Sequence, residues 1–300
     1  MLCRRNIGDR KKRKLNVIRK EKKMQRVWIT GSEGHVGSAL TEVLDCMEYR
    51  LMTTDIHEVD ITDLHQVKTY VRVNRPDVII NCAGLSDAEY CETHIDEAYK
   101  VNALGVRNIA LAAQEVCAKV IHISTDDVFD LQSEKPYNEF DETHPKTIYG
   151  KSKEAGEKFL MQLNDKFTII RSSWIYGIGR DFVDRVLRAV GNQEELEVAS
   201  NQFAVPTSSK ELAKLICHFI DNEEYGIYHA VCQGSCSRYE LAQAVLEYTN
   251  NTDNLVLKPV QGRPTYSVLD NMMLRLNGIE QPVEWKIALK EYLSEGGGNE

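Results

Sequence analysis

A glycine-rich turn between a short apolar strand and a helix lies near the start of this 300-residue chain. Residues 27–30 form an apolar run typical of a buried strand, and residues 38–44 have helical apolar spacing. Between them, Gly31, Gly34 and Gly37 form the pattern G-x-x-G-x-x-G. Glycine here allows a tight turn and a close approach of the backbone to a pyrophosphate, which the free N–H groups at the helix start can bind. The turn therefore predicts a dinucleotide-binding site.

Strands and helices alternate in the segment that follows. We expect strands at residues 51–55, 78–82, 120–123 and 167–171, and helices at 64–73, 96–116 and 149–163. The strands are continuous apolar runs, which is typical of a parallel sheet with helices on both faces. The pattern predicts an α/β fold with a doubly wound, Rossmann-type parallel sheet. In the long helix, one face is expected to carry Ala98, Val101, Leu104, Ile109 and Ala112.

The pattern becomes mixed after residue 172. Helices are expected near 209–221 and 239–249, and strands near 226–231 and 254–260. These elements predict a smaller, mixed α/β substrate-binding lobe. We expect the dinucleotide-binding domain to comprise residues 26–172 and about 206–232, and the lobe to comprise about 173–205 and 233–300.

Charge is distributed unevenly along the chain. The whole chain has a net charge of −8 and its first 25 residues carry +9, so the remaining 275 residues carry −17. We expect residues 1–25 to form a basic, disordered extension. Two alternatives are that the basic run at 10–14 binds nucleic acid or an anionic surface, and that translation begins at Met24. The acidic remainder predicts no nucleic-acid binding by the folded body.

Membrane and metal signals are weak in this sequence. No apolar run approaches the roughly 18 residues that a membrane span needs. No signal peptide opens the chain, so we expect a cytoplasmic protein without a membrane partner. The eight cysteines are irregularly spaced, without Cys-x-x-Cys or a nearby histidine cluster, which predicts free thiols and no metal site.

Tyr149 and Lys153 form a Tyr-x-x-x-Lys pair at the start of an expected helix. Residues four apart share a helix face, so the ammonium group is expected to lie beside the phenol and lower its pKa. Ser124 and Thr125 end the preceding strand, at the sheet edge where ligands bind in open α/β folds. A hydroxyl group there can donate a hydrogen bond to a substrate carbonyl. Together these residues predict a proton donor beside the bound dinucleotide.

A carboxylate ends the second expected strand, 24 residues after Gly31. Asp55 can accept hydrogen bonds from an adenosine ribose and would repel a 2′-phosphate, which slightly favours NADH over NADPH. Within the glycine turn, His35 and Val36 are expected to contact the cofactor, with His35 near its phosphates.

These residues resemble the extended short-chain dehydrogenase/reductase superfamily, and within it most closely the dTDP-4-dehydrorhamnose reductases. The resemblance runs from about residue 26 to about residue 293. The segments that carry it are 31–37, 59–63, 76–81, 101–102, 122–126, 149–153, 171–174, 201–203, 206–207, 263–264 and 267–270. Three groups, namely 171–174, 201–203 with 206–207, and 263–264 with 267–270, belong to the substrate lobe of the family and are more specific than the Rossmann motifs.

The resemblance implies roles for individual residues. It implies that Thr125, Tyr149 and Lys153 reduce the C4 keto group of a dTDP-linked deoxysugar with NADPH or NADH. Residues implied to contact the cofactor, besides the glycines, are Asp60, Ile61, Cys82, Ala83, Gly84, Asn102, Tyr149 and Lys153, with Lys153 holding the nicotinamide ribose. Those implied to contact the nucleotide sugar are Ser124, Asp126, Trp174, Gln202 and Arg263, with Arg263 a partner for the diphosphate. A homodimer and Mg²⁺ are also implied for some members.

Three positions depart from the family pattern. Asp127 stands where a tyrosine is usual, Leu85 where an aromatic residue is usual, and Asp181 where an asparagine is usual. Because Thr125-Asp126-Asp127 is close to the Thr-Asp-Glu of nucleotide-sugar 4,6-dehydratases, a dehydratase or epimerase is one alternative. A second is a non-catalytic NADP-binding subunit similar to the β subunit of methionine adenosyltransferase.

Overall fold

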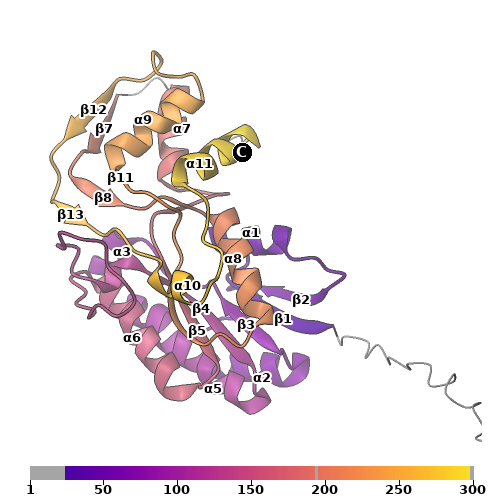
Figure 1. The fold of residues 1–300 in the computed structure, drawn as a ribbon. Coiled ribbons are helices and arrows are strands. Elements are labelled where there is room, and N and C mark those ends of the chain that lie inside the picture. Colours follow the sequence, from indigo (N-terminus) through magenta and orange to yellow (C-terminus); the bar gives the residue numbers. More distant parts are fainter. Residues whose placement is uncertain (1–23, 193–194, 298–300) are drawn as a thin grey trace, which may run out of the picture.

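The fold is built on a central sheet of six strands, seen in a computed structural model that describes residues 24–192 and 195–297. The strands are β1 (Gln25–Thr30), β2 (Tyr49–Thr54), β3 (Val78–Asn81), β4 (Lys119–Thr125), β5 (Phe167–Ser172) and β10 (Gly226–His229). Their order is β10-β5-β4-β3-β1-β2, and every neighbouring pair is parallel. The predicted doubly wound parallel sheet is therefore confirmed (Figure 1).

Helices cover both faces of this sheet. One face is covered by α1 (His35–Val43) and α8 (Ser209–Asp221), the other by α2 (Leu64–Asn74), α5 (Val106–Val116) and α6 (Ile148–Leu163). Successive strand side chains point to opposite faces, so Ile29 packs in the first core and Trp28 in the second. This alternation explains why the strands are apolar throughout.

The long helix expected at 96–116 is interrupted in the structure. Over these residues the structure has α4 (Ile95–Tyr99), a π-helical segment η1 (Lys100–Gly105) and α5, and a separate short helix α3 (Ala88–Thr93) precedes them. A π-turn contains more residues than an α-turn and shifts the side chains that follow it. Accordingly Leu104 is 45% exposed, whereas Ile109 is fully buried, so the prediction of one uninterrupted apolar face is wrong at Leu104.

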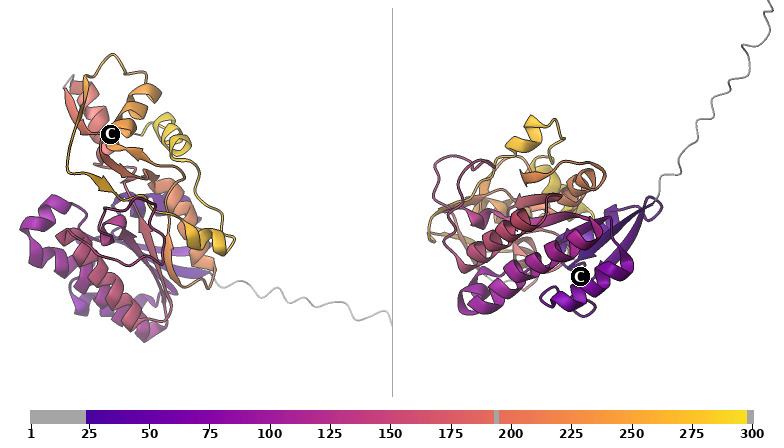
Figure 2. Two further views of the ribbon diagram at one scale, coloured as in Figure 1. Left: turned by 60° about the vertical axis from the view of Figure 1, so that its left-hand side comes forward. Right: turned by 90° about the horizontal axis from the view of Figure 1, so that it is seen from below.

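A second lobe has its own apolar core. Its helices are α7 (Phe182–Asn192), α9 (Arg238–Tyr248) and α11 (Trp285–Ser294). Its short strands form the sheets β11-β8-β13, β12-β7 and β6-β9. Their bounds are β6 (Ile175–Tyr176), β7 (Leu196–Ala199), β8 (Gln202–Ala204), β9 (Thr207–Ser208), β11 (Cys236–Ser237), β12 (Leu257–Val260) and β13 (Thr265–Tyr266). Figure 2 shows this lobe, in orange and yellow, beside the sheet.

The C-terminal part of the chain contacts both cores. Helix α10 (Met272–Leu276) packs against β10, and Leu274 and Ile279 belong to the sheet core beneath α8. The short 3-10 turn η2 (Asp126–Val128) joins β4 to the second lobe, since Val128 is buried in that lobe's core. The predicted domain boundaries stay a prediction. Helix α10 lies in the range predicted for the lobe, about 233–300, but it packs against the sheet.

Three further predictions concern the basic extension, membrane-spanning helices and the cysteines. The basic extension at 1–25 lies outside the described residues except for its last two positions. Of the helices in residues 24–192 and 195–297, none has the length and apolarity that crossing a membrane requires. The cysteines in the described part of the chain are free thiols.

Candidate active site

The glycine turn forms a cradle that side chains would fill. Gly31 has a φ of +65°, and a Cβ there would lie 2.6 Å from the backbone nitrogen of Ala83. A Cβ on Gly37 would overlap the carbonyl oxygen of Gly31. Helix α1 starts after Gly34, and no side chain caps its first N–H groups. Uncapped N–H groups and the positive dipole end suit a pyrophosphate, so the cradle fits a dinucleotide.

A cavity of about 350 Å³ opens beside this cradle. It lies where β1 and β3 end, which is where the strand order of the sheet reverses and where α/β folds bind ligands. The sequence-predicted cofactor residues that line it are Gly31, Gly34, Asp55, Asp60, Ile61, Cys82, Ala83 and Gly84. The Asp55 carboxylate accepts hydrogen bonds from the backbone N–H groups of Glu33 at 3.1 Å and Ile56 at 2.8 Å.

Asn102 lines neither this cavity nor its larger neighbour. Its side chain is buried and its Oδ1 accepts a hydrogen bond from the N–H of Leu85 at 2.8 Å. Its Nδ2 donates to the carbonyl of Leu85 and to the Ser152 hydroxyl, each at 3.0 Å. Asn102 therefore fixes the loop that carries Gly84 to helix α6, and any effect on a cofactor passes through that loop.

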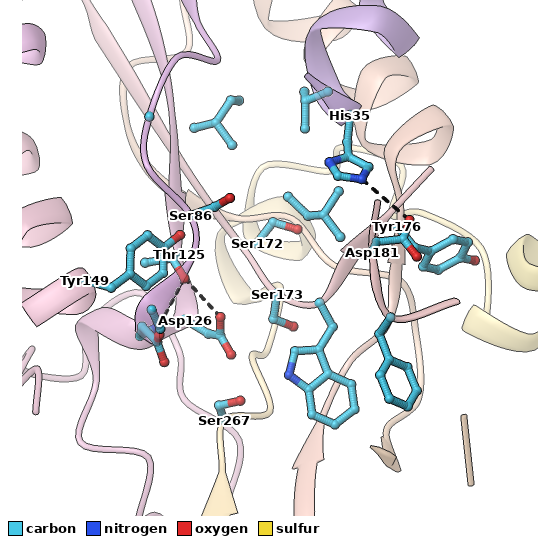
Figure 3. A pocket seen from close by; sticks show the side chains of 18 of the residues that line it. His35, Ser86, Thr125, Asp126, Tyr149, Ser172, Ser173, Tyr176, Asp181 and Ser267 are labelled. Atoms are coloured by element: carbon cyan, nitrogen blue, oxygen red, sulfur yellow. Dashed lines mark hydrogen bonds and ion pairs between the residues drawn. The ribbon is translucent and has the colours of Figure 1, made fainter. Parts of the chain in front are cut away.

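Tyr149, Thr125 and Lys153 meet in a larger cavity of about 660 Å³. The Tyr149 hydroxyl and the Thr125 side chain are hydrogen-bonding partners, and they lie side by side in Figure 3. The Lys153 Nζ donates a hydrogen bond to the carbonyl of Ile123 at 2.6 Å. Helix α6 is held in place by its Thr147 cap, whose Oγ1 accepts from the N–H of Gly150 at 2.9 Å. The cavity is also lined by Gly34, His35, Val36 and Gly37, so it adjoins the cradle.

Burial dominates the protonation of this group. It raises the pKa of Tyr149, and the hydrogen bond with Thr125 opposes the rise. It also lowers the pKa of Lys153 to about 8. The expected lowering of the phenol pKa by Lys153 is not what governs Tyr149 here, because desolvation of the phenolate is the larger effect. At neutral pH Tyr149 therefore keeps its proton.

Two carboxyl groups lie next to this pair. Burial raises the pKa of Asp126, whose Oδ1 accepts a hydrogen bond from the Thr125 hydroxyl at 3.1 Å. Burial and the neighbouring Asp126 raise the pKa of Asp127 to about 7. Both carboxyl groups line the larger cavity. The departure at Asp127 thus puts a titratable group at the site.

The substrate side of the cavity differs from the sequence prediction at one cation. Ser124, Asp126, Trp174 and Gln202 line the cavity as predicted, but Arg263 is exposed and does not line it. Gln202 instead binds the carbonyl of Arg263 at 3.3 Å. Arg238 lines the cavity in its place, and sequence reasoning missed it because nothing distinguishes it locally from a surface arginine. Ser86, Ser172, Ser173 and Ser267 are further lining residues that the sequence did not single out.

The departure at Asp181 has a structural role. Its carboxylate accepts hydrogen bonds from the N–H groups of Gly177 at 2.8 Å and Asp184 at 3.0 Å, at the start of α7. It also lies 3.6 Å from Nε2 of His35 (Figure 3). Asp181 is therefore a helix cap that faces His35.

Within the described ranges, no group of three or more His, Cys, Asp or Glu side chains is arranged to hold a metal ion, so the Mg²⁺ implied by the resemblance has no candidate site there.

Comparison with known proteins agrees with this geometry. The model described as the RmlD substrate binding domain matches residues 24–297. The spore coat polysaccharide biosynthesis protein SpsK of Bacillus subtilis is 35% identical over 91% of this chain and 98% of its own length. The dTDP-4-dehydrorhamnose reductase of Aggregatibacter actinomycetemcomitans is 34% identical, covering 89% of this chain and 98% of the relative.

A solved structure agrees closely as well. The crystal structure of dTDP-4-dehydrorhamnose reductase from Bacillus anthracis, in complex with NADP, superposes with a TM-score of 0.88. It is 38% identical and covers 91% of this chain and 99% of that one. UDP-glucose 4-epimerase of Thermus thermophilus, at 19% identity and a TM-score of 0.80, shares the fold. The chain therefore belongs to the dTDP-4-dehydrorhamnose reductase family.

Proposed function

We propose that the chain is an NADPH- or NADH-dependent reductase of the C4 keto group of a dTDP-linked deoxysugar. Its product would be dTDP-L-rhamnose or a close relative. The observation that carries the proposal is the cavity in which Tyr149 and Thr125 are hydrogen-bonding partners, with Lys153 one helical turn away and the glycine cradle adjoining. The names of the relatives, and the NADP bound to one of them, support the same reaction class.

The side chains of the cavity suit a carbonyl reduction. When bound, a reduced nicotinamide supplies the hydride for the C4 carbon. Tyr149 retains its proton because burial raises its pKa, and it donates that proton to the C4 oxygen, where negative charge develops. The Thr125 hydroxyl, whose proton is donated to Asp126 in this structure, would rotate on substrate binding and donate it to the same oxygen. Lys153 is anchored on the carbonyl of Ile123, and its remaining N–H groups would bind the nicotinamide ribose.

The cofactor preference is a separate part of the proposal. The cradle glycines with His35 and Val36 would hold the pyrophosphate, and Asp55, Asp60 and Ile61 the adenosine. The fixed Asp55 carboxylate would repel a 2′-phosphate, whereas the Bacillus anthracis relative was crystallised with NADP. Comparing kcat/KM for NADH and NADPH, in wild type and Asp55→Asn, decides the preference. A rise for NADPH alone in the variant supports repulsion.

One structural observation favours a second reaction, dehydration. Asp127 lines the cavity near Tyr149 with a pKa of about 7, which suits an acid–base group. A 4,6-dehydratase would release a 4-keto-6-deoxy sugar from dTDP-glucose without added nicotinamide.

The presence of Tyr149, Thr125 and Lys153 argues against a purely regulatory subunit. Such a subunit would bind NADPH but would turn over no nucleotide sugar.

The decisive assay follows the absorbance of the reduced nicotinamide. Purified full-length protein is incubated with dTDP-4-keto-6-deoxy-L-mannose and either NADH or NADPH. Stoichiometric loss of absorbance with formation of a dTDP-deoxyhexose supports the proposed reductase. In a separate incubation with dTDP-glucose and no added nicotinamide, release of the 4-keto-6-deoxy product would show that the chain is a dehydratase instead. Light scattering of the same sample tests the implied homodimer, and adding or chelating Mg²⁺ tests that ion. The cytoplasmic location stays a prediction.

A further inference from the structure

Arg238 is an unusual cation of the larger cavity. Three lining residues carry Lys or Arg side chains, namely Lys153, Arg180 and Arg238. Lys153 is bonded to a main-chain carbonyl, and Arg180 is exposed next to the glycine that faces His35. Arg238 lies at the first position of α9, in the second lobe, and is half-buried. Of these three described cations, Arg238 alone is neither bonded to a main-chain carbonyl nor exposed.

Two aromatic rings hold the guanidinium group of Arg238. Its Cζ lies 3.6 Å from the ring centroid of Trp174 and 4.9 Å from that of Phe182. Trp174 has a φ of +41°, a left-handed conformation that is costly for a non-glycine residue and is concentrated at functional sites. The residue with this strained backbone is thus the one whose ring stacks on the guanidinium group of Arg238.

The charge of Arg238 is not neutralised by a direct partner. Its side chain feels Asp126, Asp127 and Asp181, but within residues 24–192 and 195–297 it forms no hydrogen bond and no ion pair within 4 Å. A cation at the start of a helix is also disfavoured by the helix dipole. Burial lowers its pKa only to about 10, so it stays charged at neutral pH. A charged, half-buried guanidinium group with free N–H donors is suited to bind an oxyanion.

We propose that Arg238, clamped by Trp174 and Phe182, binds the diphosphate of the nucleotide-sugar substrate and so selects nucleotide-linked sugars over free sugars. The inference rests on the proposed function and assigns the anion-binding role to Arg238 rather than to the exposed Arg263. It also accounts for how a diphosphate is held in a cavity that Asp126 and Asp127 line. Ser172 also lines this cavity, and the residue is only 2% exposed. Its buried hydroxyl has no hydrogen-bond partner among the described residues, so it is available to donate to a bound anion.

The test is calorimetric titration of dTDP into the full-length protein saturated with NADP. Because dTDP has the diphosphate but no linked deoxyhexose, it separates binding of the nucleotide diphosphate from binding of the hexose. Arg238→Met keeps the length and the packing on Trp174 but removes the charge, and Arg238→Lys keeps the charge. Arg263→Gln tests the sequence-based alternative. Arg72→Gln, on α2 and paired with Glu115, is the matched control for loss of a surface arginine.

We expect Arg238→Met to weaken dTDP binding about tenfold to a hundredfold, as loss of a charge-assisted hydrogen bond does. Arg238→Lys should lie between Arg238→Met and wild type, Arg263→Gln and Arg72→Gln should stay within about twofold, and NADP affinity should not change. Wild-type affinity in Arg238→Met, equal losses in the Met and Lys variants, or a parallel loss of NADP affinity would each overturn the role of Arg238. Failure of the wild-type protein to bind dTDP would overturn the proposed function together with this inference.

Discussion

Replacing Tyr149 with phenylalanine removes one oxygen atom from the cavity and leaves the ring in place. The partner of that hydroxyl, Thr125, keeps two other hydrogen bonds, since it donates to Asp126 and accepts from the N–H of Asp127 at 3.2 Å. No buried polar group is therefore orphaned, and the free energy of unfolding should change by less than about 1 kcal/mol. In a chain of this size that corresponds to a change in Tm of only about 2–4 °C.

The effect on catalysis should be much larger than the effect on stability. A positioned proton donor contributes about a hundredfold to ten-thousandfold to the rate. We therefore expect Tyr149→Phe to lower kcat by at least about a hundredfold with either nicotinamide. Binding of the cofactor should persist, because the glycine cradle and the adenosine cavity do not include this hydroxyl.

The assay is the absorbance loss of NADPH with dTDP-4-keto-6-deoxy-L-mannose, together with a fluorescence titration of NADPH. Tyr70→Phe is the matched control, because it removes the same atom from a tyrosine that packs on Trp28 and lines neither cavity. The control should retain wild-type turnover. A kcat for Tyr149→Phe within about tenfold of wild type would refute the assignment of Tyr149 as the proton donor.

Three further variants test the cradle, the buried ion pair and acid stability. Gly31→Ala should weaken NADPH binding at least about tenfold, because the new Cβ would lie 2.6 Å from a backbone nitrogen and the φ of +65° costs about 1–2 kcal/mol; unchanged affinity by calorimetry would contradict this. Glu157→Leu should lower the free energy of unfolding in urea by about 3–5 kcal/mol, because it leaves Arg171, bonded to it at 2.7 Å, as an unpaired buried charge; adding Arg171→Met should recover part of the loss, and no recovery would argue against charge as the cause. Burial lowers the pKa of His229 to about 3, below its unfolded value, so the unfolded chain binds the extra proton and stability is lost as pH falls from about 6.5 toward 3. His229→Asn should therefore lose about 2 kcal/mol less than wild type between pH 7 and pH 4.5 in urea titrations, and equal losses would show that His229 does not contribute.

Local spacing made much of the site predictable. The three glycines, the strand before them and the helix after them lie within 18 residues, so their chemistry is visible without the fold. Tyr149 and Lys153 share a helix face for the same reason, because four residues make about one helical turn. The order of strands and helices followed from periodicity in the same way. The interruption at η1 was missed because a π-turn has no periodic signature in the sequence.

Other features depend on contacts between distant segments. Asn102 was expected to touch the cofactor, but its amide is bonded to Leu85, in the loop that follows β3, and to Ser152 in α6. These partners are distant from Asn102 in the sequence, so no local pattern reveals them.

The sequence by itself determined the α/β architecture, the dinucleotide cradle and the Tyr-Thr-Lys chemistry, because each follows from residue types at short, regular spacing. Only the tertiary structure decided which cation lines the larger cavity. Arg238 enters the cavity because α9 packs next to the segment that holds Trp174, and Arg263 leaves it because its loop lies at the surface. Packing between segments, unlike helical or strand periodicity, depends on the shape of the whole core and is not written in neighbouring residues.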